Sequence, residues 1–349
     1  MSESTNPSPP LLRVRNLSTG FETPRGLLWA VDGVSFDLDQ GRTMGVVGES
    51  GSGKSVLVRT VMNLLPANAV VPDDGEVMFR GRNVRDLDAI EERHFWGTEM
   101  AMVFQDPMTS LNPVKRIGRQ LTESIRFHLG LDDDAATERA LELMNQVGIP
   151  EPKKRLRQYP HELSGGMRQR VVIAIALSCS PKLLIADEPT TALDVTVQRQ
   201  ILDLLGRIQR ETDMAMILIT HDLGVVASYT DEIAVMYGGQ IVEHAATSDL
   251  FEDLAHPYTE ALLASIPRID LPSHSRLQAI SGRPPDMVAP PPGCRFAPRC
   301  AYRTDECEAA IPELISVADR MHTCRCIRPL VSHRDVAEAV VAPNRPGSS

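Results

Sequence analysis

The pattern of apolar and polar positions near the start of the chain predicts paired β-strands. Apolar residues recur in residues 11–18 (LLRVRNLS), and in residues 27–39 (LLWAVDGVSFDLD) apolar and polar positions alternate. A period of two places every second side chain on the same face of a strand, which suits a sheet with one buried face. The turn residues DQGR follow. We therefore predict an antiparallel strand region here.

The next segment combines a buried strand, a glycine-rich turn and a helix. Residues 43–65 read TMGVVGESGSGKSVLVRTVMNLL, with the apolar strand ending at Val47 and apolar residues of helical period after the turn. Two further apolar strands, KLLIADE (182–188) and AMILIT (215–220), are separated by a helix-length segment. This alternation predicts a doubly wound, parallel α/β sheet that binds its ligand at the carboxyl ends of its strands.

Two regions depart from this alternation. Residues 106–162 are mostly helical in pattern, most clearly at Ala140–Val147, so we predict a helical insertion that ends near residue 165. After Ser265 the composition changes, and we expect RPPDMVAPPPG to be an extended linker and the final VVAPNRPGSS to be disordered. The predicted organisation is a large domain over residues 1–265 and a C-terminal extension over residues 266–349.

Composition and charge narrow the classes of protein. Of the 349 residues, 42% are hydrophobic and 23% are charged, as in an ordinary globular protein. The net charge of −10 argues against a nucleic-acid partner, because binding a polyanion needs a basic face. The N-terminal MSESTNPSPP lacks the features of a secretion signal, and the apolar runs VVIAIAL and MAMILIT are too short to cross a bilayer. We expect a cytoplasmic protein.

The segment GESGSGKS matches the phosphate-binding pattern G-x-x-x-x-G-K-S/T and lies between a predicted strand and a predicted helix, as that pattern requires. Backbone amides and the helix N-terminus would hold the β- and γ-phosphates, Lys54 would reach between them, and Ser55 would ligate Mg²⁺. A flexible turn alone would explain the glycines but not the strand and helix on either side. The predicted nucleotide-binding residues are Gly48, Ser50, Gly51, Ser52, Gly53, Lys54, Ser55 and Val56.

An acidic pair ends the apolar strand in LLIADEP. Asp187 would hold Mg²⁺ through water, and Glu188 would polarise the water that attacks the γ-phosphate. Two carboxylates at a strand end are, on their own, usually a solvated terminus. Together with the phosphate-binding segment they predict a site that hydrolyses a nucleoside triphosphate.

The stretch HELSGGMRQR resembles the signature sequence of the ATP-binding-cassette ATPases. Ser164 and the amides of Gly165 and Gly166 would begin a helix, so that a terminal phosphate could dock on the helix dipole. A serine N-cap followed by two glycines would explain the helix start without any phosphate. It would not explain the phosphate-binding segment and the acidic pair in the same chain, so the chain is identified as a member of that family.

The resemblance assigns roles to further residues. Gln105, in MVFQDPMTSLNP, matches the glutamine that contacts Mg²⁺ and the attacking water. Asp194, preceded by Ala192 and Leu193, matches the loop across the dimer interface, and His221, in ILITHD, matches the switch histidine that contacts the γ-phosphate. A histidine that follows a strand is more often a packed or surface residue. Its place directly after a strand of the predicted core favours the catalytic role.

An aromatic side chain is expected to stack on the adenine ring. Phe21 follows the first predicted strand much as the aromatic residue of the family does, and Trp29 is a second candidate just before Ala30. We favour Phe21. The alternative, that both residues are core aromatics, stays open at this point.

The resemblance extends to the oligopeptide, dipeptide and nickel importer subgroup. It rests on GESGSGKSV, VFQDPMTSLNP, YPHELSGGMRQRV, DEPTTALDVTVQRQIL, HDLGVVA and HPYTEALLASIP, and it covers about residues 12–330. It implies a P-loop NTPase fold with a RecA-like core, an antiparallel β subdomain, a helical subdomain and a Cys-rich C-terminal extension. It also implies ATP and Mg²⁺ as ligands and import of peptides, with nickel or another small solute as the alternative cargo.

The same resemblance implies the partners. Each chain has one phosphate-binding segment and one signature, so a bound ATP would be completed by a second ATPase subunit, identical or related. Two transmembrane permease subunits would be driven by this pair at the cytoplasmic face of the membrane, with an extracytoplasmic binding protein acting indirectly. One rival hypothesis is a soluble cassette protein that acts on ribosomes or DNA, but such proteins usually have two fused cassettes. Another is a regulatory cassette that binds ATP without hydrolysing it, which the intact motifs disfavour.

Five of the six cysteines lie between Cys294 and Cys326. In a reducing compartment, a metal or a cluster is more plausible than disulfides. The subgroup pattern G-C-x-F-x-x-R-C, a third cysteine and H-x-x-x-C selects four ligands, which suit a 4Fe–4S cluster or tetrahedral Zn²⁺. The wide spacings favour the cluster over zinc, with Cys324 as the alternative fourth ligand and Cys179 as a buried small residue. The selected ligands are Cys294, Cys300, Cys307 and Cys326.

Overall fold

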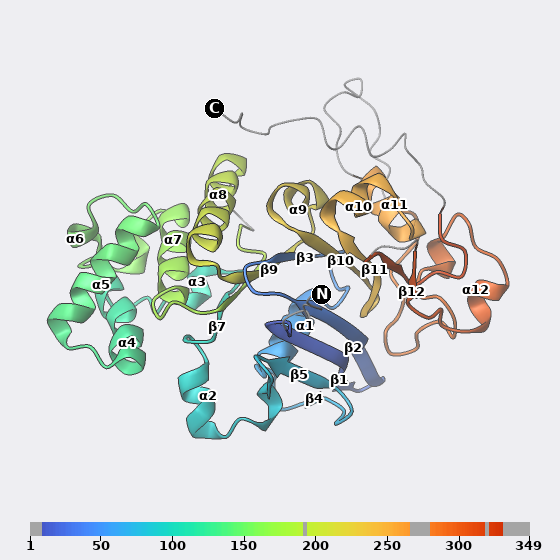
Figure 1. Cartoon of the computed structure of the whole chain (residues 1–349), viewed down its shortest axis with the longest axis horizontal. Helices are drawn as coiled ribbons and strands as arrows, with labels where there is room; N and C mark the ends of the chain where they lie inside the picture. Colours follow the sequence, from blue (N-terminus) through green and yellow to red (C-terminus); the bar gives the residue numbers. More distant parts are fainter. Residues whose placement is uncertain (1–8, 191–193, 266–279, 318–320, 331–349) are drawn as a thin grey trace, which may run out of the picture. The chain divides into compact units, whose positions relative to one another are not determined.

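The computed structural model describes residues 9–190, 194–265, 280–317 and 321–330 (Figure 1). The chain divides into two compact units, and each is described by itself. The first unit consists of Met1–Leu12, Leu38–Thr43 and Met78–Ile219, and the second of Arg13–Asp37, Met44–Val77 and Thr220–Ser349. The predicted boundary at residues 265 and 266 falls where the described residues stop, so it remains a prediction. So does the predicted disorder of VVAPNRPGSS, which lies outside the described residues.

Three parallel strands form the sheet of the first unit. They are β7 (Met100–Val103), β8 (Leu183–Asp187) and β9 (Ala215–Thr220), whose last residue belongs to the second unit. All residues of β8 and β9 are buried, as in a parallel sheet covered on both faces. β8 pairs with β7 and with β9 in parallel register. The strands predicted at KLLIADE and AMILIT are therefore confirmed.

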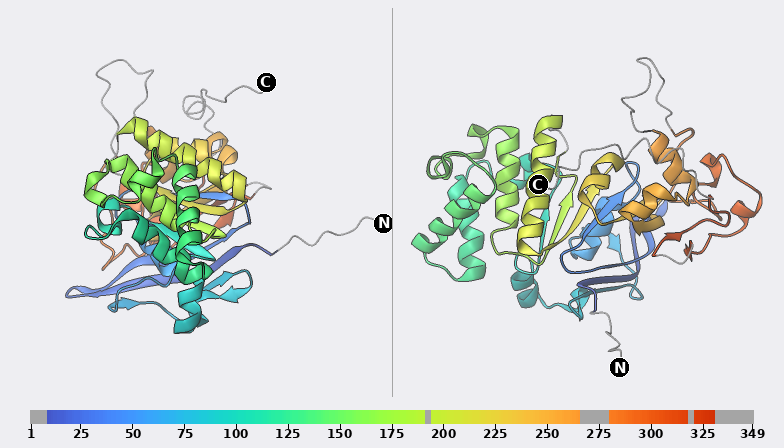
Figure 2. Two further views of the ribbon diagram at one scale, coloured as in Figure 1. Left: turned by 90° about the vertical axis from the view of Figure 1, so that its left-hand side faces the viewer. Right: turned by 45° about the horizontal axis from the view of Figure 1, so that its top comes forward.

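Helices make up the rest of the first unit. The segment predicted to be helical contains α3 (Pro107–Ser110), α4 (Ile117–Leu129), α5 (Asp133–Gln146) and α6 (Pro152–Arg155), and α7 (Gly165–Ala176) packs with α4 and α5 (Figures 1 and 2). Their inner faces bury apolar side chains such as Leu121, Leu143 and Val171. The unit also contains α8 (Val195–Thr212), α2 (Ala89–Phe95), β6 (Arg82–Asn83), η1 (Val84–Asp86) and η2 (Pro160–Glu162).

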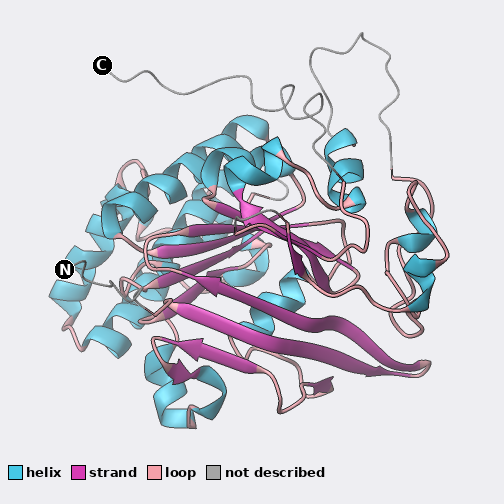
Figure 3. Ribbon diagram, turned by 45° about the vertical axis from the view of Figure 1, so that its right-hand side comes forward, coloured by secondary structure: helices cyan, strands magenta, loops and turns pink. Residues whose placement is uncertain are grey.

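The second unit begins with two long neighbouring strands, β1 (Leu12–Thr23) and β2 (Gly26–Leu38), joined by Pro24 and Arg25 (Figure 3). They confirm the strands predicted from the alternation of apolar and polar residues. The short β4 (Ala69–Val70) pairs with β1 antiparallel, and β5 (Glu76–Phe79) follows along the chain.

A second group of strands in this unit supports the phosphate-binding segment. The buried β3 (Thr43–Val47) pairs in parallel with β10 (Glu232–Tyr237), which turns through Gly238 and Gly239 into the antiparallel β11 (Gln240–Ala246). Near the C-terminus β13 (Thr323–Cys324) pairs with β11, and β12 (Ile315–Ser316) pairs with β13. The C-terminal residues therefore extend the same sheet.

The helices of this unit are α1 (Lys54–Val61), α9 (Leu223–Tyr229), α10 (Thr247–Glu252), α11 (Pro257–Ala264), η3 (Ala297–Arg299) and α12 (Glu306–Ala309). Of these, α9, α10 and α11 share an apolar core with Phe296 near the C-terminus. Tyr237 of β10, Tyr258 of α11 and Phe296 pack together, with the Tyr237 and Phe296 ring centroids 5.2 Å apart. Cys294 and Cys300 lie against this core.

The proline-rich stretch RPPDMVAPPPG contains no helix or strand, but it is not a free linker. The Met287 carbonyl accepts a hydrogen bond from the Trp29 amide at 3.3 Å, and the Asp286 carboxylate pairs with Arg25. The stretch lacks helix and strand, in keeping with the predicted extended linker, and its backbone and charged groups are bound to β2 and the turn before it. Among the described residues, no helix is both long and apolar enough to cross a membrane.

Candidate nucleotide site and cysteine pocket

The phosphate-binding segment leaves β3 as a tight loop whose glycines have a structural reason. Gly48, Gly51 and Gly53 have φ values of 153°, 80° and 103°, which side-chain-bearing residues rarely adopt. A Cβ on Gly48 would meet the Met236 carbonyl oxygen, and a Cβ on Gly53 would meet the carbonyl of Ala30. The loop can therefore approach β2 and β10 this closely only with glycine at both positions.

Lys54 is the first residue of α1 and is only 5% exposed. Its Nζ donates hydrogen bonds to the carbonyls of Gly48 at 2.7 Å and Glu49 at 3.0 Å, so the ammonium group lies inside its own loop. Gly53 is the N-cap of α1 and makes no side-chain capping hydrogen bond. An uncapped helix N-terminus beside a buried cation favours an anion such as a phosphate.

The two aromatic candidates lie on the neighbouring strands β1 and β2 and are both half-buried. Phe21 lies opposite Ala69 of β4. Trp29 packs near Gly20, since a Cβ built on Gly20 would lie 3.2 Å from the Trp29 ring. Both residues belong to the unit that carries the phosphate-binding loop, and both stay candidates for the adenine contact.

The acidic pair ends β8 as predicted. Asp187 is its last residue and is 1% exposed, whereas Glu188 is half-buried with φ 45°, an uncommon conformation for a residue other than glycine. The Glu188 amide donates to the Ile219 carbonyl at 3.1 Å. Gln105 Nε2 donates to Glu188 Oε2 at 3.0 Å, so the structure joins two of the predicted catalytic residues.

His221 lies directly after β9 in the chain and is exposed. The next residue, Asp222, is the N-cap of α9 and accepts a hydrogen bond from the Gly224 amide at 2.8 Å. His221 belongs to the second unit, whereas the acidic pair belongs to the first. Its switch role stays a prediction.

The signature residues begin α7. Ser164 is the exposed N-cap and accepts from the Met167 amide at 3.3 Å, as a serine cap does. Gly165 is exposed, and Gly166 lies so close to Val197 that an added Cβ would be 2.8 Å from its Cγ1. The helix start is therefore small and open to a partner. Its phosphate contact stays a prediction.

The predicted interface loop contains one residue whose position is described. Asp194 is the exposed N-cap of α8 and accepts a hydrogen bond from the Val197 amide at 3.0 Å. Ala192 and Leu193 lie outside the described residues. The capping contact is enough to explain an acidic residue at this position, with no need for a second subunit. The Asp194 side chain nevertheless remains exposed.

The four predicted cysteine ligands line one pocket of the second unit. This pocket has about 340 Å³ of empty space, partly open to solvent, and it is also lined by Phe296 and Tyr302. Cys324 is not among its lining residues, because it is fully buried in β13 opposite Glu243 of β11. The pocket thus favours Cys326 over Cys324; its cysteines are Cys294, Cys300, Cys307 and Cys326.

The four thiols line one pocket but are not arranged around a common metal position. Among the described residues, no group of three or more His, Cys, Asp or Glu side chains is arranged to hold a metal ion. Burial raises the pKa values of the Cys294 and Cys300 thiols, and burial with the nearby cysteines raises the pKa of Cys326 to about 11. Cys179 is buried in the first unit, as predicted, with its thiol donating to the Ser124 carbonyl at 3.8 Å.

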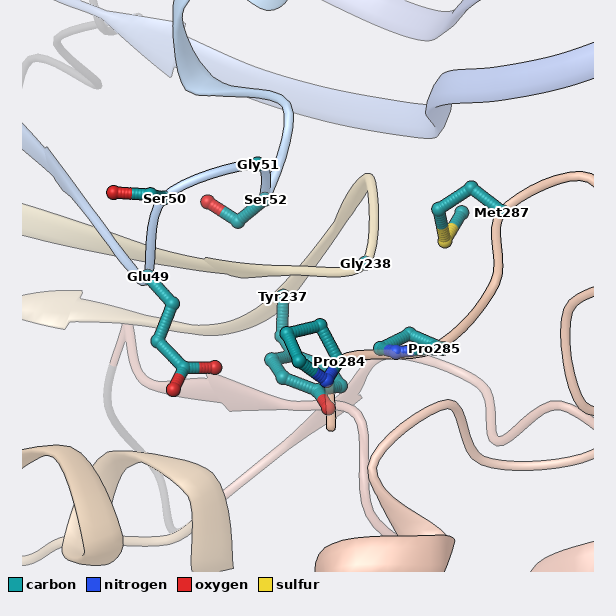
Figure 4. Close-up of a pocket in the computed structure, with 9 residues that line it drawn as sticks. All are labelled: Glu49, Ser50, Gly51, Ser52, Tyr237, Gly238, Pro284, Pro285 and Met287. Atoms are coloured by element: carbon teal, nitrogen blue, oxygen red, sulfur yellow. The ribbon is translucent and has the colours of Figure 1, made fainter. Parts of the chain in front are cut away.

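Sequence reasoning missed a contact between the phosphate-binding loop and the C-terminal residues. The Glu49 carboxylate accepts two hydrogen bonds from Arg299, at 2.6 and 3.0 Å, and the Glu49 amide donates to the Tyr258 hydroxyl at 2.8 Å. Figure 4 shows Glu49 on the same side of the loop as Tyr237 and Pro284. The sequence carries no signal for this contact except that Arg299 directly precedes a predicted ligand, Cys300.

The loop, the acidic pair after a buried parallel strand and the serine-capped signature helix define a P-loop NTPase of the ATP-binding-cassette class. Models of two protein families match the chain: ABC transporter over residues 31–191, and Oligopeptide/dipeptide transporter, C-terminal region, over residues 242–307. The chain belongs to the ABC transporter family, as an ATP-binding subunit, and the family predicted from its motifs is confirmed.

Curated relatives match nearly the whole chain. The Dipeptide transport ATP-binding protein DppD of Bacillus subtilis is 49% identical over 90% of this chain and 94% of its own length. The Oligopeptide transport ATP-binding protein OppD of Haemophilus influenzae is 48% identical over 86% of this chain and 92% of its own length.

Solved structures match the cassette. The ATP-binding cassette MJ0796, in a dimeric post-hydrolysis state with ADP and inorganic phosphate, aligns with a TM-score of 0.60 and 26% identity, covering 68% of this chain and 98% of that one. The cassette cbiO1 of Clostridium perfringens, part of a transporter complex, aligns with the same TM-score over 70% of this chain and 91% of its own. The predicted cassette fold is confirmed.

Proposed function

We propose that this protein is the ATP-hydrolysing subunit of a membrane transporter that imports peptides. The observation that carries the proposal is the near-half identity, over nine-tenths of the chain, to a dipeptide transport ATP-binding protein. The glycine-lined loop around Lys54 supports ATP as the ligand, because it combines a buried cation with an uncapped helix N-terminus. Nickel or another small solute is the alternative cargo.

The chemistry follows from the residues that the chain supplies. Lys54 and the loop amides would bind the β- and γ-phosphates, and Ser55, Asp187 and Gln105 would hold Mg²⁺ directly or through water. Bound Mg²⁺ supplies charge neutralisation of the phosphates. Glu188, oriented by its hydrogen bond from Gln105, would accept a proton from the attacking water. His221 would contact the γ-phosphate, and Phe21 or Trp29 would stack on the adenine.

The partners follow from the exposed signature helix. Ser164, Gly165 and Gly166 would dock on the ATP bound by a second ATPase subunit, with Asp194 at the same interface, so that two chains close on ATP and open after hydrolysis. The dimeric state of the similar cassette MJ0796 supports this pairing. The pair would drive two permease subunits from the cytoplasmic face of the membrane, and an extracytoplasmic binding protein would deliver the cargo. No nucleic acid takes part.

The test is uptake by the assembled transporter. The chain and the permeases encoded beside it would be reconstituted into vesicles with the cognate binding protein, and uptake of labelled di- and oligopeptides and of nickel would be measured with and without ATP. ATP-dependent uptake of peptides is the expected result. ATP-dependent uptake of nickel but not of peptides would show that the protein powers a nickel importer. If ATP increases the uptake of no cargo, the proposal is contradicted.

We also propose that the cysteine pocket holds a four-thiolate group, a 4Fe–4S cluster in preference to Zn²⁺. The support is that all four predicted ligands line one pocket while the spare Cys324 is buried elsewhere. The group would supply cross-links between parts of a C-terminal extension that has little apolar sequence of its own. Burial raises the pKa values of these thiols and so favours their protonated form. The bound metal ions would have to deprotonate them, as metal coordination does.

Anaerobic purification tests this second proposal. The protein should be brown, absorb broadly in the visible range as iron–sulfur proteins do, and lose the colour on Cys300→Ser but not on Cys324→Ser. Colourless protein with zinc would keep the four-thiolate site and reject the cluster. Protein with neither metal would reject both.

A further inference from the structure

Arg299 has every hydrogen-bond donor of its guanidinium group engaged within the second unit. Nε donates to the Ser281 carbonyl at 2.9 Å, and NH2 donates to the Ile280 carbonyl at 3.1 Å as well as to Glu49. NH1 donates to Glu49 and to the Tyr237 hydroxyl at 3.2 Å. The side chain is 3% exposed. An arginine with all five N–H groups bound in a buried position has one geometry and cannot exchange partners freely.

Glu49 is the second residue of the phosphate-binding loop. Its carboxylate takes the bidentate contact from Arg299, its amide is bound by Tyr258, and its carbonyl accepts from Lys54. Three different groups therefore fix this one loop residue, and two of them come from outside the loop. Figure 4 shows the pocket beside it, lined by residues 49–52 of the loop together with Tyr237, Gly238, Pro284, Pro285 and Met287.

A glutamate in this loop is expected to weaken the binding of ATP. A triphosphate carries several negative charges, and the Glu49 carboxylate, on a residue whose own carbonyl accepts from Lys54, would repel it. Arg299 offsets that charge through a bidentate ion pair, in which the arginine side chain is 3% and the glutamate side chain 27% exposed. The loop can thus keep its glutamate and still bind an anion.

We propose that Arg299 is a positioning residue for ATP binding, which neutralises Glu49 and fixes the loop backbone from the C-terminal extension. The inference rests on the proposed function, because it concerns the same nucleotide. It gives the extension a direct effect on the nucleotide affinity of its own cassette. Arg299 would touch the loop and not the nucleotide.

The experiment measures ATP affinity and steady-state hydrolysis in the full chain. Arg299→Ala leaves Glu49 unpaired beside the phosphates, and we expect ATP to bind about tenfold more weakly or worse, with a larger change in KM than in kcat. Arg299→Ala combined with Glu49→Gln removes the repelling charge, so affinity should return to within about threefold of the original. Arg303→Ala, which removes an exposed ion pair to Glu308 in the same extension, is the matched control.

The double variant separates an electrostatic role from a purely structural one. If Arg299 only anchored the extension, Glu49→Gln would not rescue the loss, and that result would overturn the proposal. So would unchanged affinity in Arg299→Ala. Should Arg299→Ala fail to fold, Arg299→Lys, which keeps the charge without the bidentate contact, should weaken ATP binding by less than about tenfold, and adding Glu49→Gln should restore the affinity. Failure of that rescue would overturn the proposal. Loss of ATP binding in the unaltered chain would instead refute the proposed function.

Discussion

Gln105 and Glu188, which are 83 positions apart in the chain, meet through a hydrogen bond of 3.0 Å from Nε2 to Oε2. Gln105 follows β7 and Glu188 follows β8, two strands that pair in parallel register. Parallel strands deliver the residues after their carboxyl ends to the same edge of a sheet, so the contact is a consequence of the topology. It orients the carboxylate that would act as the base.

Gln105→Ala should slow hydrolysis more than it weakens ATP binding. The substitution removes one hydrogen bond to a charged group, which contributes about 1.5–3 kcal/mol, so kcat should fall about 10- to 100-fold. Steady-state hydrolysis and equilibrium nucleotide binding of the same preparation measure the two effects. A kcat equal to that of the parent would show that the contact has no catalytic consequence.

Ser164→Arg should prevent closure of the ATPase pair while each chain still binds nucleotide. The larger, charged side chain would occupy the exposed helix start, and the phosphate-binding loop is untouched. Ser164→Ala is the control, because it removes the cap at a cost of about 1 kcal/mol without adding bulk. ATP-dependent dimerisation of Glu188→Gln chains, with and without each change, is the measurement. Normal dimerisation of the arginine variant would contradict the composite site.

Gly53→Ala should destabilise the protein more than Gly51→Ala in the absence of nucleotide. Both positions have positive φ values, but a Cβ meets the Ala30 carbonyl only at Gly53, and nothing lies within 4 Å of one at Gly51. We expect a loss of about 1 kcal/mol at Gly51 and about 3 kcal/mol or more at Gly53. Denaturant unfolding of both variants measures the difference. Equal losses would mean that close approach to β2 is not the reason for glycine.

Arg295→Ala should cost about 2–4 kcal/mol of stability. Its buried guanidinium pairs with the Asp32 carboxylate of β2 and donates to the Gly238 carbonyl, so the truncation removes a donor from each of two acceptors, although Gln240 still donates to Asp32. The exposed Arg303→Ala should cost less than about 0.5 kcal/mol. Denaturant unfolding compares the two. Similar values would show that the extension is not bound to β2 through Arg295.

The sequence predicted those parts of the molecule that short-range patterns determine. The strand, loop and helix from residue 43 to residue 61 carry their own signals, because apolar runs, glycines and helical period all lie within one segment. The acidic pair was predicted for the same reason, since Asp187 ends an apolar run. Ser164 and Asp194 are residue types that cap helices, and both do.

Contacts across long stretches of chain could not be predicted in this way. Arg299 and Glu49 are 250 positions apart, and nothing in either local pattern points to the other. β12 and β13 are two residues long each, too short for any periodicity. The proline-rich stretch lacks helix and strand, yet a backbone hydrogen bond ties it to β2 and an ion pair ties it to Arg25 in the turn before β2, which composition does not reveal.

The most direct test of the central assignment is the ATPase rate of Glu188→Gln in the assembled transporter. The amide keeps the shape of the side chain but removes the charge that polarises water, so steady-state hydrolysis should fall by several orders of magnitude, at about 1.4 kcal/mol for each tenfold loss, while ATP binding persists. An unchanged hydrolysis rate would contradict the account of this chain as an ATP-hydrolysing subunit with Glu188 as its catalytic base.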